Sequence, residues 1–268
     1  MQSIKKCLDQ VKAVSPLTLS ITNQVTINDC ANGLLAIGGS PVMSDDPQDA
    51  RALAEMASAT VINIGTTNEY KLELMLAAIS GAKKTGKPIV LDPVGVGATD
   101  VRRKTALTLI DRKPDIIRGN YSEIKALSGL TIAQKGVDSI ENDDPAIMAE
   151  VAGDLSRALK AIVAVTGATD VVAENDKVSF ISGGTPLLTR LTGTGCMLSA
   201  IAGAYAGANP ENLYDGMVAA LIHMSLAGER ARDEIGGDRL GSFRVKLFDH
   251  LTMIGGDDLA AFSGVKVL

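Results

Sequence analysis

Short runs of apolar, often β-branched residues alternate along this chain with stretches whose apolar residues recur at helical spacing. Three such runs are residues 60–64 (TVINI), 88–92 (PIVLD) and 162–166 (IVAVT), and residues 72–79 form a clear helical stretch between the first two. Strands that are apolar throughout are buried on both faces, and intervening helices allow neighbouring strands to run parallel. The alternation therefore predicts an α/β fold with a central, mostly parallel sheet and helices on both faces.

The same reasoning places the remaining elements, because glycines, prolines and polar clusters bound each of them. The chain shows no linker, low-complexity tract or internal repeat, so we expect a single domain over residues 1–268. The stretch 131–145 is polar and is predicted to be a surface loop. The other predicted elements are strands at 17–21, 41–43 and 115–118, a hairpin of 170–173 with 177–181, and helices near 47–58, 100–111, 144–159, 196–208, 211–234 and 239–251.

Composition excludes several classes of function. The formal net charge is −5, aromatic residues make up 3% and Trp is absent, so the clustered cations and stacking rings of a nucleic-acid surface are missing. The longest apolar stretches are interrupted and too short for a membrane span, which predicts a soluble protein without a membrane partner. Cys7, Cys30 and Cys196 lack metal-binding spacing and are expected to be reduced thiols in the cytoplasm. His223 and His250 lie within apolar helical stretches and are expected to be structural.

Residues 191–208 (LTGTGCMLSAIAGAYAGA) join a glycine-rich turn to the start of a helix. Gly193, Thr194 and Gly195 are small enough for a tight turn and a close approach to another group. The first N–H groups of a helix have no internal partners and its dipole is positive there, which favours an anion such as a transferring phosphoryl group. The same field favours the thiolate form of Cys196. Taken alone, the stretch is equally well explained as a plain turn before a core helix.

Further side chains that can carry chemistry follow the predicted strands, and the carboxyl ends of strands are where such folds collect ligands. Two carboxylates, an arginine and a threonine at one edge suit phosphoryl transfer from a magnesium nucleotide, which needs charge neutralisation and alignment. Mg²⁺ prefers oxygen ligands and keeps several waters. The residues at these strand ends are Asn23, Met43, Asp92, Arg118, Glu123 and Thr166.

Each of these residues also has a purely structural explanation. Asp92 can cap the following helix, Arg118 can form a surface ion pair, and Thr166 can begin a turn. Glu123 lies in the first turn of a helix, where the dipole favours an acid without any metal. Met43 is better explained as a core residue. The coincidence of polar groups at five strand ends favours a common site.

Five stretches in order along the chain carry a resemblance to a known family. Together they resemble the hydroxyethylthiazole kinase family of the ribokinase-like superfamily, and DPVGVGAT and TGTGC are the most specific. The resemblance implies a ribokinase-like three-layer sandwich, ATP- and Mg²⁺-dependent phosphorylation of the primary alcohol of 4-methyl-5-(2-hydroxyethyl)thiazole in thiamine salvage, and a homotrimer with active sites between subunits. The stretches are ITNQVTINDCANGLLAIGGSPVM, VLDPVGVGAT, IIRGNYSEI, TGTGCMLSA and GSFRVKLFDHL.

The resemblance also implies roles for single residues. Arg118 and Thr166 match ATP-binding positions, and Asp92 and Glu123 match acids placed near the magnesium and the phosphates. The positions that match the thiazole pocket are Asn23, Val25, Met43 and Gly193. The positions that match the catalytic loop are Gly193, Thr194, Gly195 and Cys196, with Cys196 where the wider superfamily usually has an Asp acting as base.

Two alternative functions stay open at this point. One is another small-alcohol kinase of the superfamily, such as a hydroxymethylpyrimidine kinase, against which Cys196 in place of Asp argues. The other is a nucleotide-binding sensor that kept the fold and lost turnover. The presence of Asp92, Arg118, Glu123 and the loop at residues 193–196 argues against such a sensor.

Overall fold

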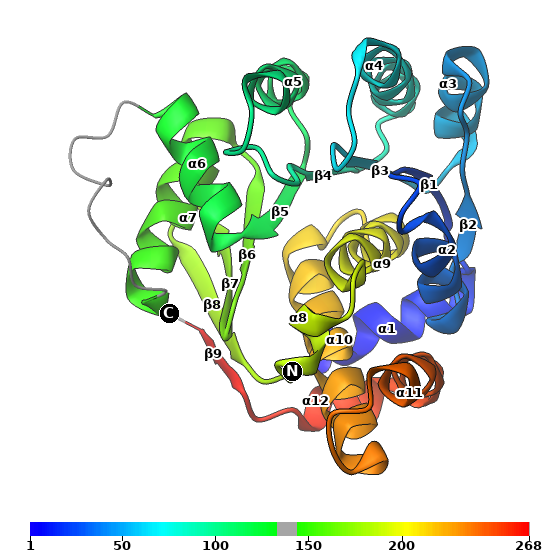
Figure 1. Cartoon of the computed structure of the whole chain (residues 1–268), viewed down its shortest axis with the longest axis vertical. Helices are drawn as coiled ribbons and strands as arrows, with labels where there is room; N and C mark the ends of the chain where they lie inside the picture. The colour runs from blue at the N-terminus through cyan, green and yellow to red at the C-terminus, as the bar shows by residue number, and fades with distance from the viewer. Residues whose placement is uncertain (133–143, 268) are drawn as a thin grey trace.

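The computed structural model describes residues 1–132 and 144–267, and in these residues one sheet organises the chain (Figure 1). Nine strands follow the order β2-β1-β3-β4-β5-β6-β7-β8-β9. The pairs from β2 to β6 are parallel, and those from β6 to β9 are antiparallel. The strands are β1 (Leu17–Ile21), β2 (Ser40–Val42), β3 (Ala59–Asn63), β4 (Ile89–Asp92), β5 (Ile116–Asn120), β6 (Ile162–Thr166), β7 (Thr169–Glu174), β8 (Lys177–Ser182) and β9 (Val265–Val267).

Helices cover both faces of this sheet (Figure 1). One face carries α3 (Pro47–Met56), α4 (Glu69–Lys84), α5 (Asp100–Ile110), α6 (Tyr121–Thr131) and α7 (Pro145–Leu159). The opposite face carries α1 (Gln2–Val14), α2 (Ile27–Ala36), α8 (Leu187–Arg190), α9 (Thr194–Ala208), α10 (Leu213–Ile235), α11 (Leu240–Met253) and α12 (Gly256–Ala261). On that second face α9 packs directly on β1, β3 and β4, and α1, α2 and α10 pack around it.

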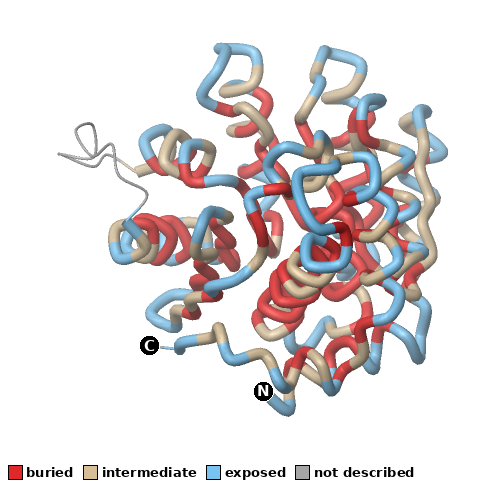
Figure 2. The backbone as a smooth tube through the Cα atoms, turned by 60° about the horizontal axis from the view of Figure 1, so that its bottom comes forward, coloured by how far each residue is buried: buried red, intermediate tan, exposed pale blue. Residues whose placement is uncertain are grey.

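The apolar core consists of two clusters, one on each face of the sheet. Figure 2 shows the buried residues gathered in the interior and the exposed ones in the peripheral turns. Helix α9 approaches the sheet closely at Gly203, where a Cβ atom would lie 2.3 Å from Cγ2 of Val61 on β3. A residue without a side chain is therefore needed for α9 to reach the sheet, and this packing holds its N-terminus beside the ends of β4 and β5.

The predicted α/β architecture is confirmed, and the strands expected at 17–21 and 162–166 have those bounds. The hairpin forms from β7 and β8. β5 extends to Asn120, beyond the predicted end of that strand, because it stays paired with β6 there. Three short elements, α8, α12 and β9, were not predicted, because they are too short to show a period.

Three further predictions concern a surface loop, the cysteines and membrane-spanning helices. The predicted surface loop at 131–145 falls mainly on residues outside the described part of the chain. All three cysteines are free thiols, as expected. Within residues 1–132 and 144–267, no helix is both long and apolar enough to cross a membrane.

Candidate active site

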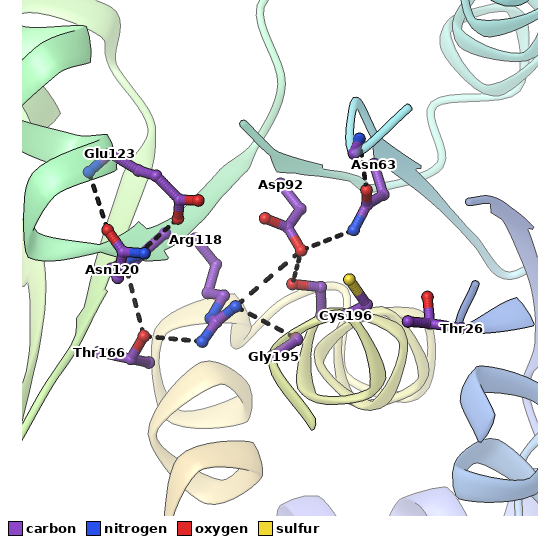
Figure 3. A network of polar contacts seen from close by, with 12 residues as sticks. Thr26, Asn63, Asp92, Arg118, Asn120, Glu123, Thr166, Gly195 and Cys196 are labelled. Atoms are coloured by element: carbon purple, nitrogen blue, oxygen red, sulfur yellow. Dashed lines mark hydrogen bonds and ion pairs between the residues drawn. The ribbon is translucent and has the colours of Figure 1, made fainter. Parts of the chain in front are cut away.

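The carboxyl ends of β3, β4, β5 and β6 meet the N-terminus of α9 at one edge of the sheet (Figure 3). The register of the parallel strands puts Asn63 beside Asp92 and Asn120 beside Thr166. Parallel strands end at the same edge, so side chains at these positions face a common region. The structure therefore brings together residues that are far apart in the sequence.

Asp92 is the most buried ionisable residue of this region, with no exposed surface. Its Oδ2 atom accepts hydrogen bonds from Asn63 Nδ2 at 2.9 Å and from Ser199 Oγ at 2.8 Å, and Arg118 Nη1 lies 3.9 Å away. Its Oδ1 atom has no partner among the described residues. Burial raises the pKa of Asp92 to about 7; the Glu123 charge also raises it, whereas Arg118 and the two hydrogen bonds lower it.

Arg118 links the end of β5 to the first turn of α9. Its Nη1 donates to the carbonyl oxygen of Gly195 at 3.1 Å, and its Nη2 donates to Thr166 Oγ1 at 2.7 Å. The side chain is almost fully buried, so it is not the surface ion pair of the alternative explanation. The guanidinium therefore places a fixed positive charge beside a helix N-terminus that already favours anions.

Glu123 is the third residue of α6 and takes part in a capping box with Asn120. Its Oε2 accepts from the Asn120 backbone N–H, and its Oε1 accepts from the backbone N–H of Gly95, both at 2.9 Å. The carboxylate thereby ties the turn after β4 to the start of α6. Each carboxylate oxygen keeps a second lone pair, so this structural role leaves room for a further ligand.

The helix predicted at 196–208 begins earlier, at Thr194, so the predicted loop at 193–196 consists of Gly193 and the first residues of α9, and its small residues are needed for packing. Gly193 precedes α9 with φ +91°, and a Cβ there would lie 2.7 Å from Cγ2 of Thr26. At Gly195 a Cβ would lie 3.0 Å from Nη1 of Arg118. Thr194 Oγ1 donates to the carbonyl oxygen of Leu188 at 2.7 Å, so this hydroxyl holds the loop in place.

Asn23 and Cys196 meet on the other side of the loop. Asn23 Nδ2 lies 3.5 Å from Cys196 Sγ; Asn23 is buried and Cys196 is half-buried. Val25 donates its backbone N–H to Asn23 Oδ1, but the residue is 71% exposed. Met43 follows β2 and packs half-buried against the core, as its structural explanation predicted.

Several residues of the site were missed by the sequence analysis. Asn63 is a polar residue at the end of a β-branched strand, which is the pattern from which Asp92 was predicted. Ser199 lies one helical turn after Cys196 on α9, which was also a usable signal. Thr26 carried no signal, because its contacts with Asn23 and with the loop before α9 depend on how α2 packs against α9.

The site contains no ready-made metal cage. In the described part of the chain, His, Cys, Asp and Glu side chains nowhere gather in threes as a metal site would need. The unpartnered Asp92 Oδ1 and the neighbouring Glu123 fit a hydrated hard cation, which one or two carboxylates and substrate phosphates are enough to hold. Chemically, the site offers buried positive charge, a helix N-terminus and two carboxylates at the carboxyl ends of neighbouring strands.

Comparison with known proteins agrees with this arrangement. The model of the hydroxyethylthiazole kinase family matches residues 8–256. The chain is 41% identical to a hydroxyethylthiazole kinase of Clostridium beijerinckii, over 98% of this chain and 96% of that protein. It is also 41% identical to that of Clostridium acetobutylicum, with 96% of each chain covered.

Solved structures show the same likeness. The structure of a hydroxyethylthiazole kinase protein from Pyrococcus horikoshii OT3 superimposes with a TM-score of 0.91 at 35% identity and covers both chains fully. A pyridoxal kinase of Bacillus subtilis matches with a TM-score of 0.59 at 18% identity, over 81% of this chain and 92% of that one. The second match concerns the fold alone, which is ribokinase-like.

Proposed function

The chain belongs to the hydroxyethylthiazole kinase family, and on this premise we propose that it transfers the γ-phosphoryl group of ATP to the primary alcohol of 4-methyl-5-(2-hydroxyethyl)thiazole. Such an enzyme is a phosphotransferase with an alcohol as acceptor. The observation that carries the proposal at this site is the N-terminus of α9 with Arg118 bonded to its first turn. A transferring phosphoryl group is an anion, and these groups are oriented before it arrives.

The residues of the site have different roles in the transfer of the phosphoryl group. The free N–H groups at the start of α9 and the Arg118 guanidinium stabilise negative charge on the phosphoryl oxygens. Thr166 holds one end of that guanidinium, which fixes its direction. The oxygen of the alcohol forms a bond to the γ-phosphorus, the bond from that phosphorus to the bridging oxygen breaks, and the electron pair leaves with ADP. The proton of the alcohol passes to Cys196 Sγ.

Asp92 and Glu123 are the residues that would hold Mg²⁺, through the free Asp92 Oδ1 and the remaining lone pairs of Glu123. Bound Mg²⁺ neutralises and aligns the phosphates of the nucleotide. The donors on Asp92 Oδ2, Asn63 and Ser199, keep the carboxylate turned so that Oδ1 stays available.

The alcohol would lie against Asn23 and Gly193, near Cys196, with Val25 and Met43 at the border of its pocket. The exposed side chain of Val25 supports a pocket completed by a second subunit of a homotrimer. The free cysteines support a reducing compartment, the cytoplasm. In the described residues the strands form one nine-stranded sheet, which supports a single domain.

The proposal is tested by identifying the product. The purified protein is incubated with ATP, Mg²⁺ and the thiazole alcohol, and the thiazole is analysed by mass spectrometry. We expect a mass gain of one phosphoryl group. The methyl ether of the same thiazole, which has no hydroxyl proton, serves as the matched control and is expected to stay unmodified. An unmodified alcohol in the presence of folded protein would contradict the proposal.

A further inference from the structure

The carboxamide of Asn23 is held in one orientation by its own surroundings. Its Oδ1 atom accepts from the backbone N–H of Val25 at 3.1 Å, from that of Thr26 at 3.2 Å and from Thr26 Oγ1 at 3.2 Å. A backbone N–H can only donate, so the oxygen must face these groups. The NH₂ group is therefore the end that faces Cys196, with Nδ2 3.5 Å from Sγ.

A second cysteine supports the same direction. Cys30 lies on α2, and its Sγ is 3.8 Å from Thr26 Oγ1. Burial raises the pKa of the Cys30 thiol to about 12, so this sulfur keeps its proton and donates it to the Thr26 hydroxyl. The hydroxyl in turn donates to Asn23 Oδ1. Every hydrogen bond in the series from Cys30 to Cys196 therefore points toward the Cys196 sulfur.

We propose that Asn23 is a positioning residue that holds Cys196 as a thiolate, by donating an Nδ2–H hydrogen bond that the thiolate accepts better than the thiol. A neutral thiol is a weak acceptor, whereas hydrogen bonds to a charged group are stronger. The donor thus favours the deprotonated sulfur and also fixes where it points. This role is additional to any contact that Asn23 makes with the alcohol, and its meaning for turnover rests on the proposed phosphoryl transfer.

Two charged residues contact the first turns of α9, and their effects on a thiolate have opposite signs. Asp92 at the end of β4 has a pKa raised to about 7 by burial and disfavours a thiolate nearby when it is ionised, whereas Cys30 on α2 is uncharged. Arg118 of β5 favours the thiolate, since it is bonded to the residue before Cys196. Of these groups only Asn23 has a hydrogen bond to the Cys196 sulfur. Replacing Asn23 therefore tests the effect of this hydrogen bond separately from the effect of the nearby charges.

In the reaction this arrangement gives the alcohol a ready proton acceptor. The O–H bond of the alcohol breaks as its oxygen bonds to the γ-phosphorus, and the proton goes to the Cys196 sulfur. The thiolate becomes a thiol, so the negative charge moves from sulfur to the departing ADP. The hydrogen bond from Asn23 stabilises the deprotonated starting form of this acceptor and fixes the direction in which the sulfur points.

The test is the pH dependence of alkylation of Cys196 by iodoacetamide, located by peptide mass, because only the thiolate reacts. Asn23→Asp keeps Oδ1 for its three donors but replaces the NH₂ group by an oxygen. Asn23→Leu has a similar shape and removes the donor without adding charge. Asn32→Asp, on an exposed position of α2, is the matched control for an added carboxylate.

We expect the pH midpoint of alkylation to rise by about one unit in Asn23→Asp, which makes alkylation roughly tenfold slower at pH values below both midpoints. In Asn23→Leu the midpoint should rise by a smaller amount, and in Asn32→Asp it should equal that of the wild type. A second measurement needs no variant. The ¹⁵N chemical shift of the Asn23 side chain in the wild type should change with pH, with the same midpoint as the alkylation of Cys196.

An unchanged midpoint in folded Asn23→Asp or Asn23→Leu would overturn the inference. If neither variant folds, the wild-type resonance decides. A change of the Asn23 chemical shift at the alkylation midpoint supports the inference, and no change at that midpoint overturns it. Alkylation needs neither ATP nor the thiazole. A wild type that alkylates as expected but makes no phosphate ester would therefore refute the proposed function and leave the hydrogen bond established.

Discussion

At the scale of single residues, the charge of the buried Asp92 carboxylate lowers the stability of the fold, although the proposed reaction needs it. Its folded-state pKa of about 7 is above the unfolded value, so the unfolded chain ionises first as the pH rises. Stability contributed by the protonated form is full below about pH 4 and is lost as the pH rises toward 7. The site therefore keeps a carboxylate whose charge destabilises the empty fold at neutral pH.

We predict that Asp92→Asn loses roughly two or more orders of magnitude in kcat, because the charge is needed mainly in the transition state. In metal-free buffer at pH 8 the same variant should unfold with a larger free energy than the wild type, by at most about 4 kcal/mol. The two curves should converge toward pH 4. Denaturant titrations at both pH values measure this, and a less stable variant at pH 8 would contradict the buried-charge explanation.

His223 gives the opposite pH dependence. Its Nε2 lies 2.9 Å from the carbonyl oxygen of Leu251 and must donate to it, so Nδ1 accepts from Tyr205 Oη at 2.8 Å. Burial lowers the pKa of His223 to about 4. Since the unfolded chain takes up the proton first, this contribution is full above about pH 6.5 and is lost as the pH falls toward 4.

We therefore predict that His223→Gln is less sensitive to acid than the wild type. The imidazole should account for about 3 kcal/mol of the stability that the wild type loses between pH 7 and pH 4. Urea titrations of both proteins at the two pH values give the difference. Parallel loss in the two proteins would show that the imidazole is already charged or exposed in the fold.

At the scale of elements, α9 connects the packing of the fold to the site. Gly203→Ala would place a Cβ 2.3 Å from Val61 Cγ2 and 3.0 Å from Thr18 Cγ2. Overpacking of this kind costs about 1–3 kcal/mol, and a displaced α9 would also move the loop at 193–196. We predict a lower melting temperature together with a lower kcat.

The matched control is Gly129→Ala on α6, where the added Cβ would meet no other described residue within 4 Å outside its own helix backbone. This change should raise stability by about 0.5–1 kcal/mol through helix propensity and leave kcat unchanged. Differential scanning calorimetry of the two variants makes the comparison. Equal behaviour of the two glycine variants would mean that α9 does not need its close approach to the sheet.

The elements also show how far sequence can predict this fold. Strands such as β6 were found because their apolar runs are buried on both faces, and Asp92 was found because it ends one of them. Short elements such as β9 have no period of their own. The bond from Ser199 to Asp92 spans 107 positions of the chain and arises only when α9 packs on the sheet, so sequence pattern alone does not predict it.

At the scale of the whole molecule, exposed apolar side chains lie on neighbouring helices. Leu35 of α2 and Val245 of α11 are each 58% exposed, and the two helices are joined by the ion pair between Asp29 and Arg244. Val25, which borders the proposed thiazole pocket, lies just ahead of α2. This surface is where we expect subunits of the proposed trimer to meet.

We predict that light scattering at micromolar concentration gives three times the 27.8 kDa mass of one chain. Leu35→Glu should lower that mass and raise the KM for the thiazole, because the pocket is completed across the interface. Val101→Glu, at an equally exposed position on α5, should change neither. A fully active monomer would refute a site between subunits.

The central claim is that this molecule phosphorylates the thiazole alcohol, and the most direct measurement is the rate of ADP release with different acceptors. Parallel reactions contain ATP and Mg²⁺ with the thiazole alcohol, with hydroxymethylpyrimidine, or with no acceptor. We predict ADP release that depends on the thiazole alcohol and stays at the acceptor-free rate with the pyrimidine. A higher rate with the pyrimidine alcohol, or the same low rate in all three reactions from folded protein, would contradict the account.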